Sequence, residues 1–143
     1  MILTEAYPHR LDVNRLVLLD HGVLHSADLG GPESLHPPLP IRAGELGVKR
    51  TAIEEGLQVM VRAKLIEMSA GDRGIEFVAS DNAYAFVSVL ESNYATTLHE
   101  RVEWMFGHFS DLSEDALRTE MRSILSSWAE EFGPTDALFE GTI

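Results

Sequence analysis

The chain has 143 residues, which is enough for one domain that buries its own core without a disulfide or a metal ion. Hydrophobic residues make up 45% of it and charged residues 24%, an ordinary globular composition that argues against a disordered chain. The net charge is −12, and because phosphate contacts need a basic surface, this argues against nonspecific binding of nucleic acid.

The absence of cysteine excludes a disulfide scaffold, a thiolate zinc site, an iron–sulfur cluster and a cysteine nucleophile. No apolar run approaches the roughly 18 residues that a membrane span needs, so we expect no membrane contact. The N-terminus lacks the basic and apolar regions of an export signal, and we therefore expect a cytoplasmic protein.

The first predicted helix runs from Asp12 to His25, with the Asp12 carboxylate as its N-cap and apolar residues around most of its circumference. Residues 27–44 follow and contain four of the six prolines and three of the eleven glycines. Helix and strand interiors do not tolerate this density, so the segment is predicted to be a loop. Loops of this length are often functional.

Residues 44–64 are predicted to form two helices with a tight joint: a short turn at 45–48 and a longer helix capped by Thr51 and Glu54. Apolar residues then alternate with polar ones across 65–80, around a Gly-Asp-Arg-Gly turn, which predicts a β-hairpin. The order helix, turn, helix, hairpin is that of a winged helix-turn-helix. We expect a mainly α fold with a small hairpin, in which this core spans 11–80.

Three further helices are predicted in a C-terminal extension over residues 81–132, with Asp81, Asn93 and Ser113 as their N-caps. The first of them should reach Glu91. The last has the cleanest apolar stripe, made of Leu117, Met121, Ile124, Leu125, Trp128 and Phe132. Gly133-Pro134 ends it and leaves a short tail at 133–143. We expect residues 1–143 to form a single domain.

Three histidines, His21, His25 and His36, lie within 16 residues of one another. His21 and His25 are spaced as two ligands on one helical face, but Gly22 stands where a metalloprotease motif has its glutamate. The favoured interpretation is structural, with His25 and His36 holding the proline-rich loop. A metal-dependent enzyme built on these histidines and Asp28 is the less favoured one. Neighbouring serines lack a nucleophile motif, so a hydrolase is disfavoured.

Basic residues gather around the longer helix of the 44–64 pair and the hairpin tip: Arg42, Lys49, Arg50, Arg62, Lys64 and Arg73. In a DNA-binding winged helix, Lys49, Arg50, Arg62 and Arg73 would be expected to touch the duplex. Glu54 and Glu55 lie near the start of the same helix and would repel it. We therefore expect a protein-interaction module, with DNA bound only weakly or through a complex.

The stretch from Leu11 to Glu67 resembles the small middle component of bacterial ABC-three-component systems. The likeness is carried by LDVNRLVLLD, by HSADLGGPESLHP, by RAGELGVKR and by the LI that begins the hairpin. It continues more weakly through IEFVAS, SNYATTLHERVEWM and the last helix, and so covers most of residues 11–132. The segment HSADLGGPESLHP is its specific part, since the rest is generic for winged helices.

This resemblance implies a winged-helix adaptor that is not the catalyst, and we expect no cofactor. Its partners would be a coiled-coil ABC ATPase related to chromosome-maintenance ATPases and a third, effector-like protein. Such systems act against phage or other foreign DNA, and no catalytic residue is transferred from the family. We expect the partner surface to involve His25, Asp28, His36, Arg42, Lys49, Arg50, Arg62 and Lys64. The alternative is a dimeric winged-helix transcription regulator; a homodimer is compatible with either function.

Overall fold

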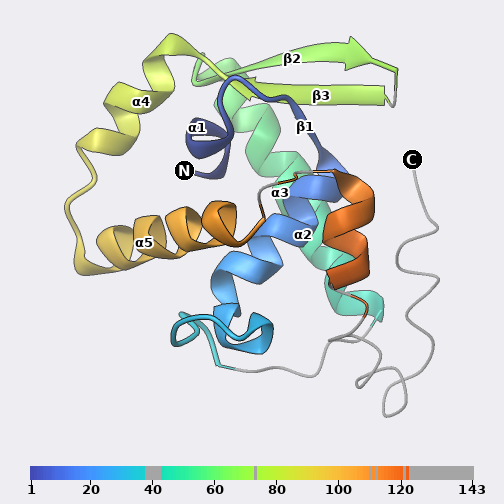
Figure 1. Ribbon diagram of the computed structural model, residues 1–143. Helices are drawn as coiled ribbons and strands as arrows, with labels where there is room; N and C mark the ends of the chain where they lie inside the picture. The colour runs from blue at the N-terminus through green and yellow to red at the C-terminus, as the bar shows by residue number, and fades with distance from the viewer. Residues whose placement is uncertain (38–42, 73, 110, 112, 121, 123–143) are drawn as a thin grey trace.

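The computed structural model of the chain describes residues 1–37, 43–72, 74–109, 111, 113–120 and 122 (Figure 1). The order of elements is α1 (Ile2–Ala6), β1 (Leu11–Asp12), α2 (Val13–Leu24), the 3₁₀ helix η1 (Ser26–Leu29), α3 (Ala43–Arg62), β2 (Ile66–Gly71), β3 (Gly74–Ala79), α4 (Asp81–Ser88) and α5 (Asn93–His108). Residues 114–120 are also helical. The fold is mainly helical with one small antiparallel sheet, as predicted.

The predicted hairpin is confirmed and belongs to a three-stranded sheet in the order β1-β3-β2. Ile66 pairs with Ala79 at one end of the hairpin, and Gly71 pairs with Gly74 at the other. Strand β1 adds to the free edge of β3, with Leu11 opposite Phe77. This third strand escaped the sequence analysis because two residues are too few to show an alternating pattern.

The first predicted helix is confirmed as α2, and its N-cap is Asp12, whose carboxylate accepts from the Arg15 amide at 2.8 Å. The helix is central because its buried residues surround most of its circumference: Leu16, Leu18, Leu19, His21, Gly22 and Val23. Figure 1 shows α2 beside α3, with α5 crossing it and the sheet above. These elements share one hydrophobic core.

The short N-terminal helix, where no element was predicted, also contributes to this core. Helix α1 buries Leu3 and Ala6 against α5, α2 and β3. Helix α5 contributes Val102 and Met105, and Phe109 at its C-cap adds a third buried side chain. The core therefore extends across residues that lie far apart in the sequence.

The predicted joint between helices at 45–48 and 51–64 is wrong. Residues Ala43–Arg62 form one continuous helix of 20 residues, α3. Thr51 is not an N-cap, because its hydroxyl donates to the carbonyl of Gly47 at 3.1 Å within the helix. Inside a helix, a threonine hydroxyl can donate its hydrogen bond to the carbonyl one turn earlier. A capping pattern therefore does not prove that a helix starts at the threonine.

The predicted caps of α4 and α5 lie one residue too late. The hydroxyl of Ser80 accepts from the Asn82 amide, and that of Ser92 accepts from the Ala95 amide. Ser and Asp or Asn are similarly good caps, so adjacent pairs of them leave the first residue ambiguous. Helix α4 ends at Ser88 and not at Glu91.

The alternating pattern of the hairpin is buried only near its base. Ile66, Phe77 and Ala79 are in the core, whereas Met68 and Ile75 are exposed because the hairpin extends beyond the helices that cover its base. The pattern correctly identified one face of the sheet but could not show where the covering layer ends.

Several predictions concern residues outside those described. They are the apolar stripe of the last helix beyond Leu117, the tail at 133–143, Arg42 and Arg73. At the start of that helix, Ser113 is confirmed as a cap, since its hydroxyl accepts from the Ala116 amide at 3.2 Å. Leu117 is fully buried. No helix within the described part of the chain is long and apolar enough to cross a membrane.

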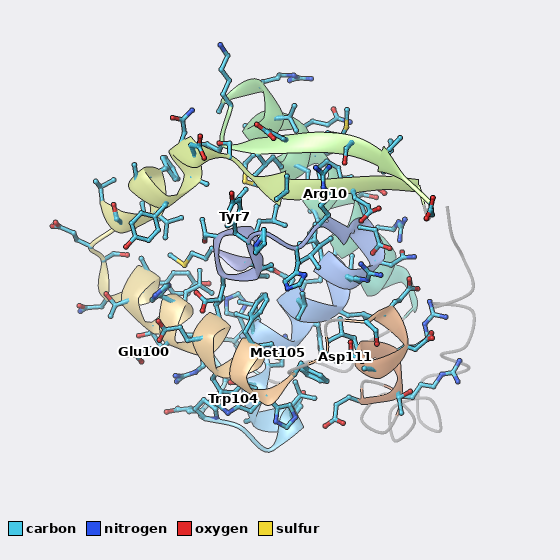
Figure 2. The ribbon with its side chains drawn as sticks, turned by 45° about the horizontal axis from the view of Figure 1, so that its top comes forward. Tyr7, Arg10, Glu100, Trp104, Met105 and Asp111 are labelled. Carbon is cyan, nitrogen blue, oxygen red and sulfur yellow. The ribbon has the colours of Figure 1, made fainter. Side chains whose placement is uncertain are left out.

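Helices α2 and α5 pack closely at Gly22. A Cβ atom at Gly22 would lie 2.8 Å from Met105 Sδ and 3.0 Å from Leu29 Cδ1, closer than side chains tolerate. Met105 is itself fully buried, so its side chain could give way only by repacking the core around it. Figure 2 shows Met105 on α5, where this helix passes over the core. Gly22 therefore sets the distance between the two helices.

We predict that Gly22→Ala lowers the free energy of unfolding by about 1–3 kcal/mol, because the added methyl group overpacks the crossing. Gly56→Ala is the matched control. Gly56 lies in the interior of α3, and a Cβ there meets no atom within 4 Å. Its replacement should raise the same free energy by about 0.5–1 kcal/mol through helix propensity. Urea unfolding measures both, and equal effects would contradict the role of Gly22.

Candidate functional site

The segment after α2, residues 26–37, is compact although it contains prolines and glycines. It begins with η1, and Gly30 ends this turn with φ +75°, a conformation that favours glycine. Ser26 is fully buried, and its hydroxyl donates to the carbonyl of Pro32 at 2.9 Å. The hydroxyl of Ser34 accepts from the Ala27 amide at 3.1 Å. The two serines thus close the segment on itself.

Helix α5 holds this segment from one side. The Arg101 guanidinium donates from Nε to the carbonyl of Glu33 at 2.8 Å, and His36 Nε2 lies 3.0 Å from the hydroxyl of Tyr94. Gly31 lies against the Trp104 ring, and a Cβ there would be 2.7 Å from Trp104 Cε2. Figure 2 shows Trp104 and Glu100 along α5. The segment is therefore a fixed surface and not a free loop.

The three histidines meet at the junction of α2 and this segment. The ring centroids of His21 and His25 are 4.7 Å apart, and those of His25 and His36 are 6.3 Å apart. Among the described residues, no group of three or more His, Asp or Glu side chains is arranged to hold a metal ion. His36 holds the segment through Tyr94 of α5, so the predicted holding role applies to this residue, with a partner that was not predicted.

Burial lowers the pKa of His21 to about 3, helped by the nearby His25 ring and the Lys49 ammonium. Burial also lowers the pKa of His25, and Lys49 adds to this effect, while the Asp28 and Asp20 carboxylates oppose it. Both imidazoles are therefore neutral at pH 7. They are buried, packed ring against ring, and are not cationic partner contacts.

The predicted basic cluster is divided along α3. Lys49 forms an ion pair with Asp20 of α2, with 2.8 Å between Nζ and the carboxylate. Arg50 pairs with Glu54 at 3.2 Å and also donates to the Asn14 side chain. Arg62 and Lys64 lie near the other end of α3, roughly 20 Å away at the rise of a helix. These residues do not form one patch.

The remaining predicted site residues each have separate surroundings. Asp28 lies in η1, and its Oδ2 atom is buried without a hydrogen-bond partner among the described residues. Lys64 has φ +62°, and its carbonyl accepts from Ser80 and Asn82, which ties the end of α3 to the start of α4. Its side chain is exposed, as is that of Arg62. Arg42 and Arg73 are not among the described residues.

Sequence reasoning missed the α5 residues that hold the segment, namely Tyr94, Arg101 and Trp104. Tyr94 is 51% exposed and does not belong to the core. The three positions share one helical face by spacing, yet the sequence does not indicate which loop that face meets. A loop rich in proline and glycine gives no periodicity from which its partner helix could be found.

The family model described as ABC-three component (ABC-3C) system Middle Component 2 matches residues 1–131. No curated protein and no solved structure matches the chain. The matched range includes α1, the segment 26–37 and α5, so the parts that build this site all lie within it.

We predict that the protein loses stability as the pH falls from about 6.5 towards 3. A histidine with a lowered pKa stays neutral in the folded chain while the unfolded chain takes up a proton. For one such proton the slope is roughly 1.4 kcal/mol per pH unit. We expect His21→Gln to reduce the slope of the unfolding free energy against pH by about this amount, as measured by urea unfolding between pH 6 and pH 4 (~two units). His9→Gln, at an exposed residue, is the control. An unchanged slope in His21→Gln would contradict the assignment.

Proposed function

The chain belongs to the ABC-three component (ABC-3C) system Middle Component 2 family, and from this premise we propose that it is a non-catalytic adaptor in the cytoplasm. It would join a coiled-coil ABC ATPase to a third, effector-like component in a system that acts against phage or foreign DNA. The observation that carries the proposal is the family match over residues 1–131. The absence of cysteine and the acidic net charge also support the adaptor role.

The segment 26–37 is the surface proposed for the first partner. Its serine bonds and its contacts with α5 fix its shape before binding. A preorganised surface loses little conformational entropy on association, which favours a stable complex. His25 and Asp28 would shape this surface from within, whereas His36 lies where the segment meets Tyr94.

The basic residues are proposed to contribute in two ways. Lys49 and Arg50 would act by holding α3 against α2 through Asp20 and Asn14. Arg62 and Lys64 would contact a partner directly, since their side chains are exposed at the far end of α3. Arg42 belongs to the same proposal on the strength of its position in the sequence just before α3.

A winged-helix relationship is part of the proposal. It is supported by the order β1, α2, α3, β2, β3 and by the strand order β1-β3-β2. In such a domain α3 would face DNA. Two of its basic residues are already paired within the chain, and Glu54 and Glu55 are exposed on it. We therefore favour a protein partner over DNA, and the dimeric regulator stays the alternative.

The test is co-expression of this chain with the two proteins encoded beside it, followed by affinity purification on this chain. We predict recovery of an ATPase at fixed stoichiometry. His36→Ala and Arg62→Ala should each lower the recovered ATPase by about tenfold if they are at the centre of the interface. His9→Ala is the matched control and should leave recovery unchanged.

A lone dimer of this chain would contradict the adaptor function. Binding to its own promoter with a steep dependence on salt would then support the regulator, because counterion release accompanies phosphate contacts. Full recovery of the ATPase with both His36→Ala and Arg62→Ala would keep the adaptor function but move the interface away from these residues.

A further inference from the structure

A large apolar groove lies away from the segment 26–37, between α1, α3, α4 and α5. Its volume is about 390 Å³. Its walls are Leu3 of α1, Ile53, Leu57 and Met60 of α3, Phe86 and Val87 of α4 with Leu90 beyond it, and Leu98 and Val102 of α5. Asp20 is the only acidic or basic side chain among the described residues that line it, and its charge is paired with Lys49.

Helix α4 is the least covered wall of this groove. Ala83 is its one buried residue among those described, whereas Phe86 is 51% and Leu90 41% exposed. Ala83, Phe86, Val87 and Leu90 follow the spacing i, i+3, i+4 and i+7, which is the stripe through which helices pack on helices. Figure 1 shows α4 standing apart from α5, joined to it by an open arch. A half-exposed stripe of this kind typically marks a binding surface.

The charged side chains along the α4 side of the groove are acidic, whereas the amino group of Met1 and Lys49, paired with Asp20, lie on its other side. Residues 75–100 include most of β3, all of α4 and half of α5. They contain four acidic residues, Glu76, Asp81, Glu91 and Glu100, but no lysine or arginine. Asp81 begins α4, and Glu91 directly follows Leu90 at its other end. No ion pair of Asp81 or Glu91 is found among the described residues. The apolar stripe is therefore bordered by acidic groups.

We propose that this groove binds an amphipathic helix of a partner protein, whose apolar face is flanked by lysine or arginine. The helical spacing of the exposed stripe suits a helix, and the acidic border suits basic flanks. A second copy of this chain fits less well, because it would bring two acidic borders together. The proposal goes beyond the adaptor function and does not depend on it, since the groove and the segment 26–37 are separate surfaces.

Gly56 allows the groove to be filled without damage to the fold. It lies in the floor of the groove on α3, and a Cβ atom there meets nothing within 4 Å. Gly56→Leu should therefore block the groove while the chain stays folded. Gly107→Leu is the matched control, because a Cβ at Gly107 of α5 also meets nothing within 4 Å and Gly107 does not line the groove.

The probes are two synthetic helical peptides of about 18 residues, roughly five turns, with leucines at i, i+3, i+4 and i+7. One carries lysine at the remaining positions and the other glutamate. Fluorescence anisotropy with the full chain should give a Kd at least about tenfold lower for the lysine peptide. Gly56→Leu and Phe86→Glu should weaken its binding by about tenfold or more. Gly107→Leu and Ile75→Glu, at an exposed residue of the hairpin tip, should change it by less than about twofold.

The proposal is overturned if the chain binds neither peptide, if it binds both equally, or if Gly56→Leu leaves binding intact in a folded protein. Sedimentation that shows a dimer broken by Phe86→Glu would assign the groove to a second copy instead. If the double variant Leu138→Asp, Phe139→Asp binds the lysine peptide and the unchanged chain does not, the groove is occupied by the chain's own C-terminal tail. Circular dichroism of each variant shows whether it is folded.

Discussion

The close crossing of α2 and α5 at Gly22 is the constraint on which the rest of the structure depends. The missing side chain lets Met105 and Leu29 pack against the backbone of α2. It places α5 where Trp104 meets Gly31 and Arg101 meets the carbonyl of Glu33. The same helix contributes Leu98 and Val102 to the apolar groove. One contact between two helices therefore positions both candidate binding surfaces.

The two surfaces differ in chemistry, which suits a protein that connects two partners. Residues 26–37 form a fixed segment, closed by serine hydrogen bonds, beside two neutral histidines. The groove is apolar, half open and bordered by acidic residues. Because each surface offers a different kind of complementarity, the same partner helix would not suit both. An adaptor that distinguishes its partners needs such a difference.

Local patterns predicted α2, the hairpin and the presence of a helix at α5, because hydrophobic spacing and capping residues such as Asp12 act over a few residues. The predicted break in α3 was wrong, since Thr51 bonds back to Gly47 instead of starting a helix. Strand β1 and the packing of residues 26–37 on α5 depend on contacts between distant positions, such as His36 with Tyr94. Periodicity carries no information about such contacts. For the same reason the sequence grouped Lys49 with Arg62, which α3 holds far apart.

The measurement that tests the account most directly is hydrogen–deuterium exchange of this chain, alone and in the complex with the proteins encoded beside it. The account predicts slower exchange on binding in two separate regions, the amides of 26–37 and those of α4 with the start of α5. Helix α2 should change little, because its amides are already buried in the core. Protection confined to the exposed face of α3 and the hairpin would contradict it and point to a winged helix that uses its DNA-facing side. A chain that forms no complex would contradict the adaptor function itself.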